Sequence, residues 1–143
     1  MISFTTYLIT GEIIGSGICQ ESTLELQGNP QKGILVMEGA SDYNTQYVDN
    51  GQIINKPSKP VNGEYLFDYT NKTWVPNSSK QEAVIKMLRN DLLAKSDWTD
   101  TASAPTRLGT EIYNAWQEYR QLLRDIPQQS GYPYNVVWPT PPG

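Results

Sequence analysis

The sequence predicts an α+β protein, with a small antiparallel β-module followed by a helical hairpin and an extended Trp-Pro tail. Residues 1–77 contain short runs of β-branched and aromatic residues separated by turn signals, a pattern typical of strands. In residues 78–143, apolar residues recur at helical spacing. The charge balance changes at the same place, from four basic against eight acidic residues to seven of each. We therefore expect two domains, residues 1–77 and 78–143.

The N-terminal strands are predicted from the positions of the apolar runs and of the turns between them. Thr10-Gly11 can turn the chain between the first two runs, and Asn50-Gly51 supplies the positive φ that a tight hairpin turn requires. Residues 22–27 are expected to form one helical turn capped by Ser22. The predicted strands are residues 2–9, 12–19, 33–38 (expected to be buried), 46–48, 52–54, 65–68 and 72–75.

The first helix is predicted to begin at Ser78 or Ser79 and to end near residues 95–97. Glu82 lies three residues after Ser79, which fits a capping box at the start of a helix. The apolar residues that follow would line one face of this helix, and they are Val84, Ile85, Leu88, Leu92 and Leu93.

The second helix is predicted over about residues 107–124. Gly109 leaves its start open, because an interior glycine costs roughly 1 kcal/mol against alanine, and Pro127 ends it. Its apolar stripe is Ile112, Trp116, Tyr119 and Leu123. The apolar residues 132–139 should form an extended tail laid across the two helices.

The overall charge argues against nucleic acid and membranes as partners. A net charge of −4 and a pI of about 4.7 offer neither the basic face that nucleic acid requires nor attraction to anionic lipids. No apolar run approaches the roughly 20 residues of a membrane-spanning helix. The N-terminus also lacks the basic region of a secretory signal.

Histidine is absent from the sequence, which removes the Ser-His-Asp and Cys-His catalytic arrangements and the histidine metal sites. Cys19 is the single cysteine, and its apolar surroundings favour a small core residue. No phosphate-binding loop, nucleophile elbow or calcium loop is present. We expect a protein that is not an enzyme, with no catalytic residues, no metal and no cofactor. The enzymatic alternative is a glycan hydrolase, which would need a cleft with two facing carboxylates.

The C-terminal half resembles the tail assembly chaperone family of tailed bacteriophages. The resemblance runs from about residue 80 to the C-terminus and uses several tryptophans, which are rare residues. It is carried by Leu93-Ala-Lys-Ser96-Asp97-Trp98-Thr99, by Ala115-Trp116, by Tyr119-Arg120-Gln121-x-Leu123-Arg124-Asp125-Ile126-Pro127 and by Val137-Trp138-Pro139.

This resemblance implies a chaperone that binds a tail or tail-fibre structural polypeptide and assists its folding or attachment. It implies work in the host cytoplasm during assembly, with retention in the virion tail left open. The alternative is a permanent structural adaptor of the fibre or baseplate. The resemblance gives the candidate partner-binding residues, which are Asp97, Trp98, Trp116, Tyr119, Arg120, Arg124 and Trp138.

Each tryptophan of this set also has a purely structural interpretation. Trp116 lies on the helical stripe and fits a core position, and Trp138 would cover the open side of the helix pair. Trp98 falls at a helix end, where it would either cap the core or face a partner.

The two arginines lie one turn apart on the second helix. Arg120 and Arg124 would belong to a solvated face near the helix C-terminus, or would clamp a carboxylate. That carboxylate would be Asp97, Asp125 or one supplied by a partner.

Overall fold

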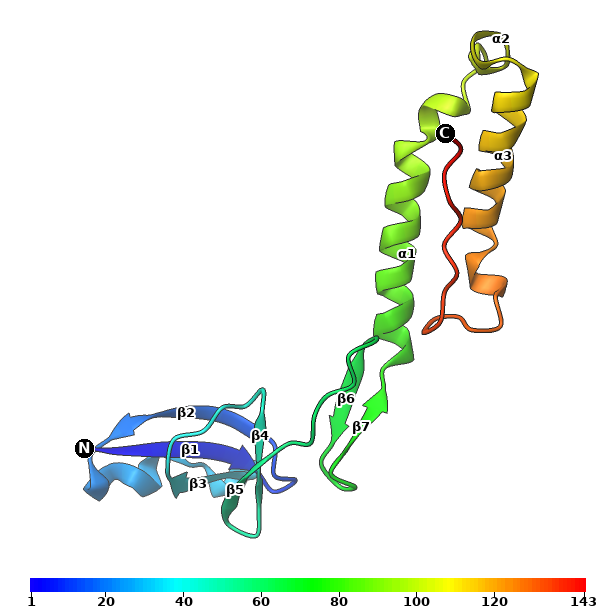
Figure 1. Ribbon diagram of the computed structural model, residues 1–143. Helices are drawn as coiled ribbons and strands as arrows, with labels where there is room; N and C mark the ends of the chain where they lie inside the picture. The colour runs from blue at the N-terminus through cyan, green and yellow to red at the C-terminus, as the bar shows by residue number, and fades with distance from the viewer. The chain divides into compact units, whose positions relative to one another are not determined.

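The computed structural model describes residues 1–143 and divides into two compact units. Unit 1 comprises Met1–Val61 and Tyr65–Val75, and unit 2 comprises Asn62–Glu64 and Pro76–Gly143. The strands belong to unit 1 and the α-helices to unit 2, so the α+β class is confirmed (Figure 1). The division into two domains at residues 1–77 and 78–143 stays a prediction.

Unit 1 contains a three-stranded antiparallel sheet of order β2-β1-β3. Its strands are β1 (Ile2–Leu8), β2 (Ile13–Cys19) and β3 (Ile34–Glu38). The predicted hairpin between β1 and β2 is confirmed. Its turn uses Gly11 at φ +95°, and a Cβ there would collide with the carbonyl oxygen of Val48.

Two predictions for unit 1 were wrong in detail. The segment after β2 is a 3-10 helix, η1 (Glu21–Gln27), whose N-cap is Gln20 and not Ser22. A second 3-10 turn, η2 (Pro30–Lys32), leads into β3. The strand β3 is half-buried rather than buried, because it lies at an edge of the sheet, where only Ile34 has a second partner, Asn29.

Two further hairpins complete unit 1, and both confirm the predicted turns. β4 (Gln46–Asp49) pairs with β5 (Gln52–Asn55) around Asn50 and Gly51, whose φ angles are 49° and 74°. β6 (Tyr65–Asp68) lies beside β7 (Thr73–Pro76).

These hairpins meet around Phe67. Its ring lies 5.3 Å from Tyr47, 5.0 Å from Tyr69 and 5.2 Å from Trp74 between ring centroids. The ammonium of Lys56 lies over the same ring at 5.2 Å and donates to the carbonyl oxygen of Tyr43. Burial lowers the pKa of Lys56, because partial removal from water disfavours its charged form.

Unit 2 is built on two long helices that lie side by side (Figure 1). α1 (Ser78–Lys95) ends where predicted, but its N-cap is Asn77, whose side chain accepts a hydrogen bond from the Lys80 amide. The capping box of Ser79 and Glu82 was therefore wrong. η3 (Asp97–Thr99) follows α1.

The predicted second helix is divided at Gly109. α2 (Ala104–Leu108) stops there and α3 (Thr110–Arg124) begins after it. Gly109 has a φ of +82°, which interrupts the helical path and which glycine adopts without strain. Pro127 lies in the closing 3-10 turn, η4 (Ile126–Gln128).

The core of unit 2 lies between α1, α3 and the tail. Its buried residues are Ile85, Tyr119, Leu123 and Ile126. The partly buried residues packed against it are Leu92, Leu93, Trp116, Tyr132, Val136 and Trp138.

The predicted stripes extend further than this core. Leu88 and Ile112 are exposed, so their assignment to packed faces was wrong. Helix geometry places Leu88 about 60° around the helix axis from Ile85, at the edge of the buried face.

The C-terminal residues turn before they run along the helices. Residues 130–135 form turns, in which the Asn135 amide donates to the Gly131 carbonyl at 2.7 Å and the Tyr132–Pro133 peptide bond is cis. The expectation of an extended chain from residue 132 was therefore wrong at its start. Residues 136–143 have no regular secondary structure, so the extended Trp-Pro tail is not confirmed.

Gln81 ties segment 62–64 into unit 2. Its Oε1 accepts from the Glu64 amide at 3.0 Å, and its Nε2 donates to the Pro133 carbonyl at 3.2 Å. The Tyr134 hydroxyl donates to the Glu64 carbonyl at 3.1 Å. One buried amide thus joins the start of α1, segment 62–64 and the turn before the tail.

Leu123→Ala should destabilise unit 2 by about 2–5 kcal/mol, because Leu123 is fully buried and its truncation leaves a cavity. The matched control is Leu122→Ala, since the neighbouring leucine is 49% exposed. Its cost should stay below about 1 kcal/mol. Urea unfolding followed by helical circular dichroism measures both. Equal losses for the two variants would contradict the core assignment.

Candidate functional site

A chain of aromatic rings leads from the core of unit 2 to its surface. Trp98 meets Trp116 edge to face, with centroids 5.3 Å apart, and Trp116 meets Tyr119 at 5.6 Å. Tyr119 is buried, Trp116 is half-buried and Trp98 is 44% exposed. The outermost ring therefore combines a packed edge with a free apolar surface.

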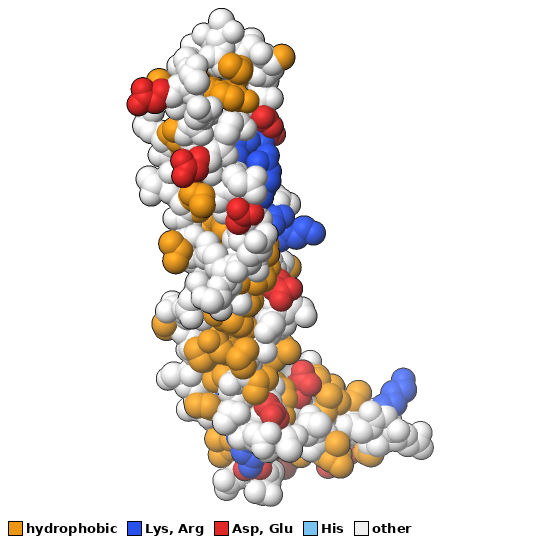
Figure 2. Space-filling model, turned by 90° about the vertical axis from the view of Figure 1, so that its right-hand side faces the viewer, with side chains coloured by type: hydrophobic (Ala, Val, Ile, Leu, Met, Phe, Trp, Pro, Cys, Tyr) orange, Lys and Arg blue, Asp and Glu red, His pale blue; other side chains and the backbone are white.

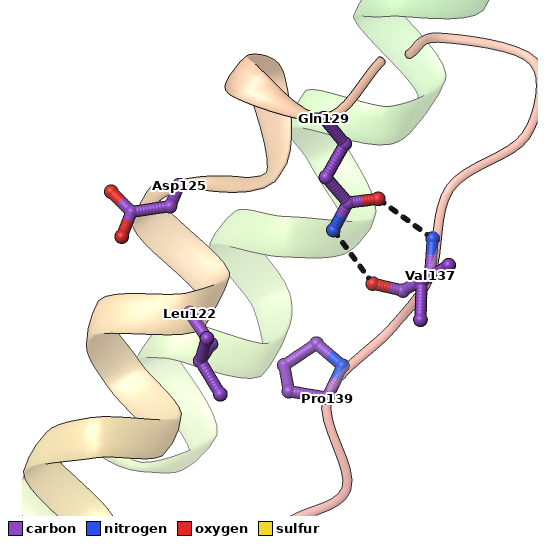
Figure 3. A pocket seen from close by; sticks show the side chains of 5 residues that line it. All are labelled: Leu122, Asp125, Gln129, Val137 and Pro139. Atoms are coloured by element: carbon purple, nitrogen blue, oxygen red, sulfur yellow. Dashed lines mark hydrogen bonds between the residues drawn. The ribbon is translucent and has the colours of Figure 1, made fainter. Parts of the chain in front are cut away.

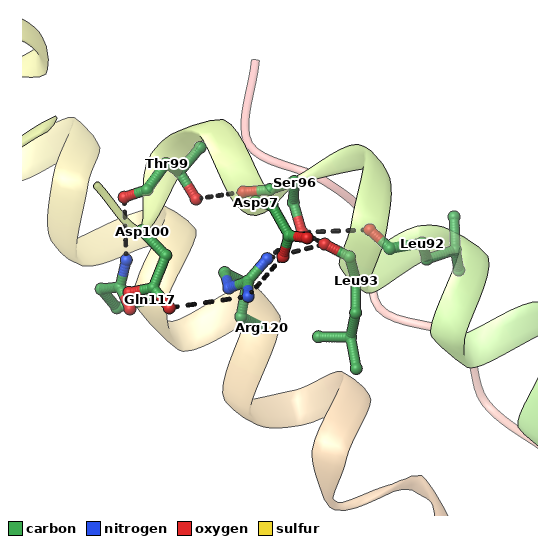
Figure 4. A network of polar contacts seen from close by, with 8 residues as sticks. All are labelled: Leu92, Leu93, Ser96, Asp97, Thr99, Asp100, Gln117 and Arg120. Carbon is green, nitrogen blue, oxygen red and sulfur yellow. Dashed lines mark hydrogen bonds and ion pairs between the residues drawn. The ribbon is translucent and has the colours of Figure 1, made fainter.

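Arg120 bonds to the end of α1 and to Asp97, the residue before Trp98 (Figure 4). Its Nη1 donates to the Leu93 carbonyl at 2.7 Å and to the Ser96 hydroxyl at 2.8 Å. Its Nη2 donates to the Asp97 carboxylate at 3.0 Å, and Asp100 lies 3.6 Å away. Arg120 is only 5% exposed, so its interpretation as part of a solvated face was wrong.

The local sequence explains why α1 ends at this place. The Ser96 hydroxyl donates to the last carbonyl groups of the helix, at Leu92 and Leu93, each at 3.0 Å. The Thr99 hydroxyl then donates to the Ser96 carbonyl, which holds η3 in its turn. A cation from α3 beside these carbonyl groups also complements the helix dipole. The Arg120 Nε is buried without a hydrogen-bond partner.

Two features near the C-terminal end of α1 were not predicted from the sequence. Arg107 lies over the Trp98 ring at 5.6 Å and donates to the Trp98 carbonyl. A small apolar cavity of about 170 Å³ lies beside the aromatic chain. Its lining residues are Leu92, Lys95, Ser96, Trp116, Tyr119 and Pro141. This volume is below the roughly 300–1,000 Å³ of small-molecule sites.

A second cavity of about 230 Å³ lies between α3 and the tail (Figure 3). Leu122, Asp125 and Pro139 line it together with Gln129 and Val137. The Gln129 side chain accepts from the Val137 amide and donates to the Val137 carbonyl, both at 2.8 Å. The side-chain amide of Gln129 therefore bonds the tail backbone as a neighbouring β-strand would.

The structure brings together five of the seven candidate residues and separates the other two. Asp97, Trp98, Trp116, Tyr119 and Arg120 form one contiguous group. Arg124 is exposed on α3 and makes no ion pair. Trp138 packs on the core from the tail. Whether any of the seven contacts a partner stays a prediction.

The surface of the helical unit is mixed in character. Figure 2 shows hydrophobic side chains on one face of the molecule, separated over the helical part by acidic and basic ones. No group of three or more metal-ligating side chains gathers in the structure. None of its helices combines the length and apolar character needed to cross a bilayer.

Arg120→Lys should lower the unfolding free energy of unit 2 by about 2–4 kcal/mol, because an ammonium cannot reproduce the planar set of contacts in a buried position. Asp97→Asn is the control within the same network. Asp97 is exposed, so its loss should cost no more than about 1 kcal/mol. Urea unfolding of both variants measures the difference. Parent-like stability of Arg120→Lys would refute the role given to Arg120.

Neither the curated proteins nor the solved structures contain a match to this chain. A family model does match its C-terminal part, and the matched segment contains nearly all of α1, the aromatic chain, Arg120 and the tail. The match covers residues 82–143, and the family is described as phage tail assembly chaperone protein.

Proposed function

We propose that the protein binds a structural polypeptide of a phage tail, in particular of the tail fibre, and assists its folding or attachment. The family of the C-terminal part supports a role in tail assembly in general. The observation that carries the finer proposal is the position of Trp98, an exposed ring within the matched segment that packs on Trp116 and follows Asp97, to which Arg120 bonds. Tryptophan and arginine are enriched among the residues that dominate binding energy.

The proposed mechanism is reversible covering of apolar surface. A tail polypeptide exposes such surface before it oligomerises, and a protein that binds it there competes with aggregation by mass action. The Trp98 ring and the adjacent apolar cavity of about 170 Å³ would take apolar side chains of that polypeptide. Lys95 and Asp97, both exposed beside them, would contact its polar rim.

The direct test is co-expression of the full chain with each tail structural polypeptide of the same phage, one at a time. We expect one of them, a fibre polypeptide, to co-purify with the chain and to be more soluble in its presence. Co-purification with a different tail polypeptide would overturn the fibre assignment. Failure of all of them to bind would overturn the proposal.

Trp98→Ala should weaken that complex by about 30-fold or more, because it removes an exposed ring at the proposed contact. Met87→Ala is the control, since Met87 is exposed elsewhere on α1. Calorimetric titration measures both affinities, and thermal melting checks that both variants stay folded. An unchanged affinity of Trp98→Ala would place the contact elsewhere.

The second candidate function is a permanent adaptor of the fibre or baseplate. The observation that favours it is unit 1, a separate β-unit outside the matched segment that could hold a second component. Quantitative mass spectrometry of purified virions distinguishes the two. A chaperone that leaves after assembly is absent from virions, whereas an adaptor is present at a fixed ratio to the fibre.

We also propose that the protein acts by binding and not by catalysis. The absence of histidine and of nucleophile motifs from the sequence supports this. Bound tail polypeptide should keep its mass and its modifications after prolonged incubation with the chain. Cleavage or group transfer detected by mass spectrometry would overturn this proposal.

A further inference from the structure

β2 is an edge strand with a free side. It pairs with β1 alone, in a sheet of order β2-β1-β3. No segment outside the sheet bonds to the backbone groups of residues 14–18, and the one backbone contact from outside the sheet to a side chain there is the Ser41 amide, which donates to the Ser16 hydroxyl at 3.4 Å. The strand alternates regularly, with Ile14, Ser16 and Ile18 exposed. Ile14 is 46% exposed and Ile18 is 66% exposed, so apolar side chains flank an unpaired backbone.

This edge lacks the features that usually protect an edge strand. Natural sheets discourage pairing between chains with charged residues, prolines or covering segments at their edges. Residues 13–19, Ile-Ile-Gly-Ser-Gly-Ile-Cys, contain no charge and no proline. Gly15 and Gly17 carry no side chain, because Thr6 and Phe4 of β1 occupy the space that a Cβ would need. The backbone of β2 is therefore open to another strand.

The sequence of β2 is nearly symmetric about Ser16. Gly15 mirrors Gly17 and Ile14 mirrors Ile18. A two-fold symmetric interface places the same surface on both copies, so that residue i meets residue j and j meets i. Two antiparallel β2 strands with Ser16 opposite Ser16 satisfy this condition and place Ile14 of each copy beside Ile18 of the other.

We propose that the free edge of β2 pairs antiparallel with β2 of a second copy of this chain, with the two-fold axis at Ser16. The pairing joins two three-stranded sheets into one of six strands.

This register is possible for either alternate set of β2 residues whose backbone groups point toward the second copy. In an antiparallel ladder, alternate residues face a given neighbour. The two alternate sets of β2 are residues 14, 16 and 18 and residues 13, 15, 17 and 19, and both are symmetric about Ser16. The bulge opposite Thr6 and Tyr7 leaves Ile14 unpaired with β1 and lies outside the central Gly-Ser-Gly segment.

Charges at the ends of the strand do not oppose this pairing. The same register brings Glu12 of one copy opposite Gln20 of the other, and Glu21 opposite Gly11. No two like charges therefore meet directly, whereas like charges directly opposite each other would destabilise the pair. On the apolar face, two Ile14–Ile18 contacts each add a cross-strand pair.

The resulting dimer is weak and concentration-dependent, because one strand pair buries less than the roughly 1,200–2,000 Å² of a standard interface. Sedimentation of the full chain over about 5–500 µM covers the range in which such an interface dissociates. We expect monomer at the low end and dimer at the high end. A chain that stays monomeric throughout overturns the proposal.

Ile18→Lys tests the edge itself, because it places two positive charges in the pairing zone. Its dimer dissociation constant should rise by about ten-fold or more. Leu26→Lys is the control, since Leu26 is 78% exposed on η1 and outside the pairing zone. It should dimerise like the parent. Circular dichroism confirms that both variants are folded. Equal dimerisation of the two variants overturns the proposal.

A disulfide at the symmetry axis tests the register independently of dimer affinity. In a Cys19→Ala background, Ser16→Cys places one thiol of each copy opposite the other, within the usual Cα separation of a disulfide. Ser58→Cys is the matched control, an exposed serine on a connector of the same unit. In a glutathione buffer, Ser16→Cys should form cross-linked dimer at about ten times the rate of Ser58→Cys or faster. Equal rates overturn the register.

Discussion

The guanidinium of Arg120 is the contact on which the aromatic end of the helical unit depends. It reaches from α3 to the Leu93 carbonyl and the Ser96 hydroxyl at the end of α1. The last carbonyl groups of a helix otherwise lack partners, so these bonds satisfy the end of α1 and fix it to α3 together. Trp98 follows immediately and is presented from a fixed backbone. Arg120, predicted as a candidate binding residue, thus bonds the end of α1 within the unit itself.

Unit 2 has a small core and completes it with its own tail. Its central cluster contains four buried residues, and Trp138 from the tail packs against them. Gln129 holds the tail at Val137, and both cavities of the unit are lined in part by tail prolines, Pro139 and Pro141. The tail therefore forms part of the walls of both cavities, and its removal would change both.

Unit 1 differs from unit 2, because its short strands do not enclose a continuous core. The Phe67 cluster holds the two later hairpins, while Thr5 is buried in the sheet and donates to the Gly39 carbonyl at 2.8 Å. Small three-stranded sheets leave two edges open. In this chain, β2 combines such an edge with a Gly-Ser-Gly segment and flanking isoleucines.

The sequence by itself determined the fold class, the three hairpin turns, the end of α1 and the family of the C-terminal part, because these rest on local spacing and on rare residues in fixed order. It did not determine that the second helix breaks at Gly109 or that Asn77 caps α1, since several nearby residues could interrupt or cap a helix. Only the tertiary structure decided that Arg120 is buried while Arg124 is exposed. Both lie on one helix, one turn apart, and their difference comes from α1, which approaches α3 at one of them.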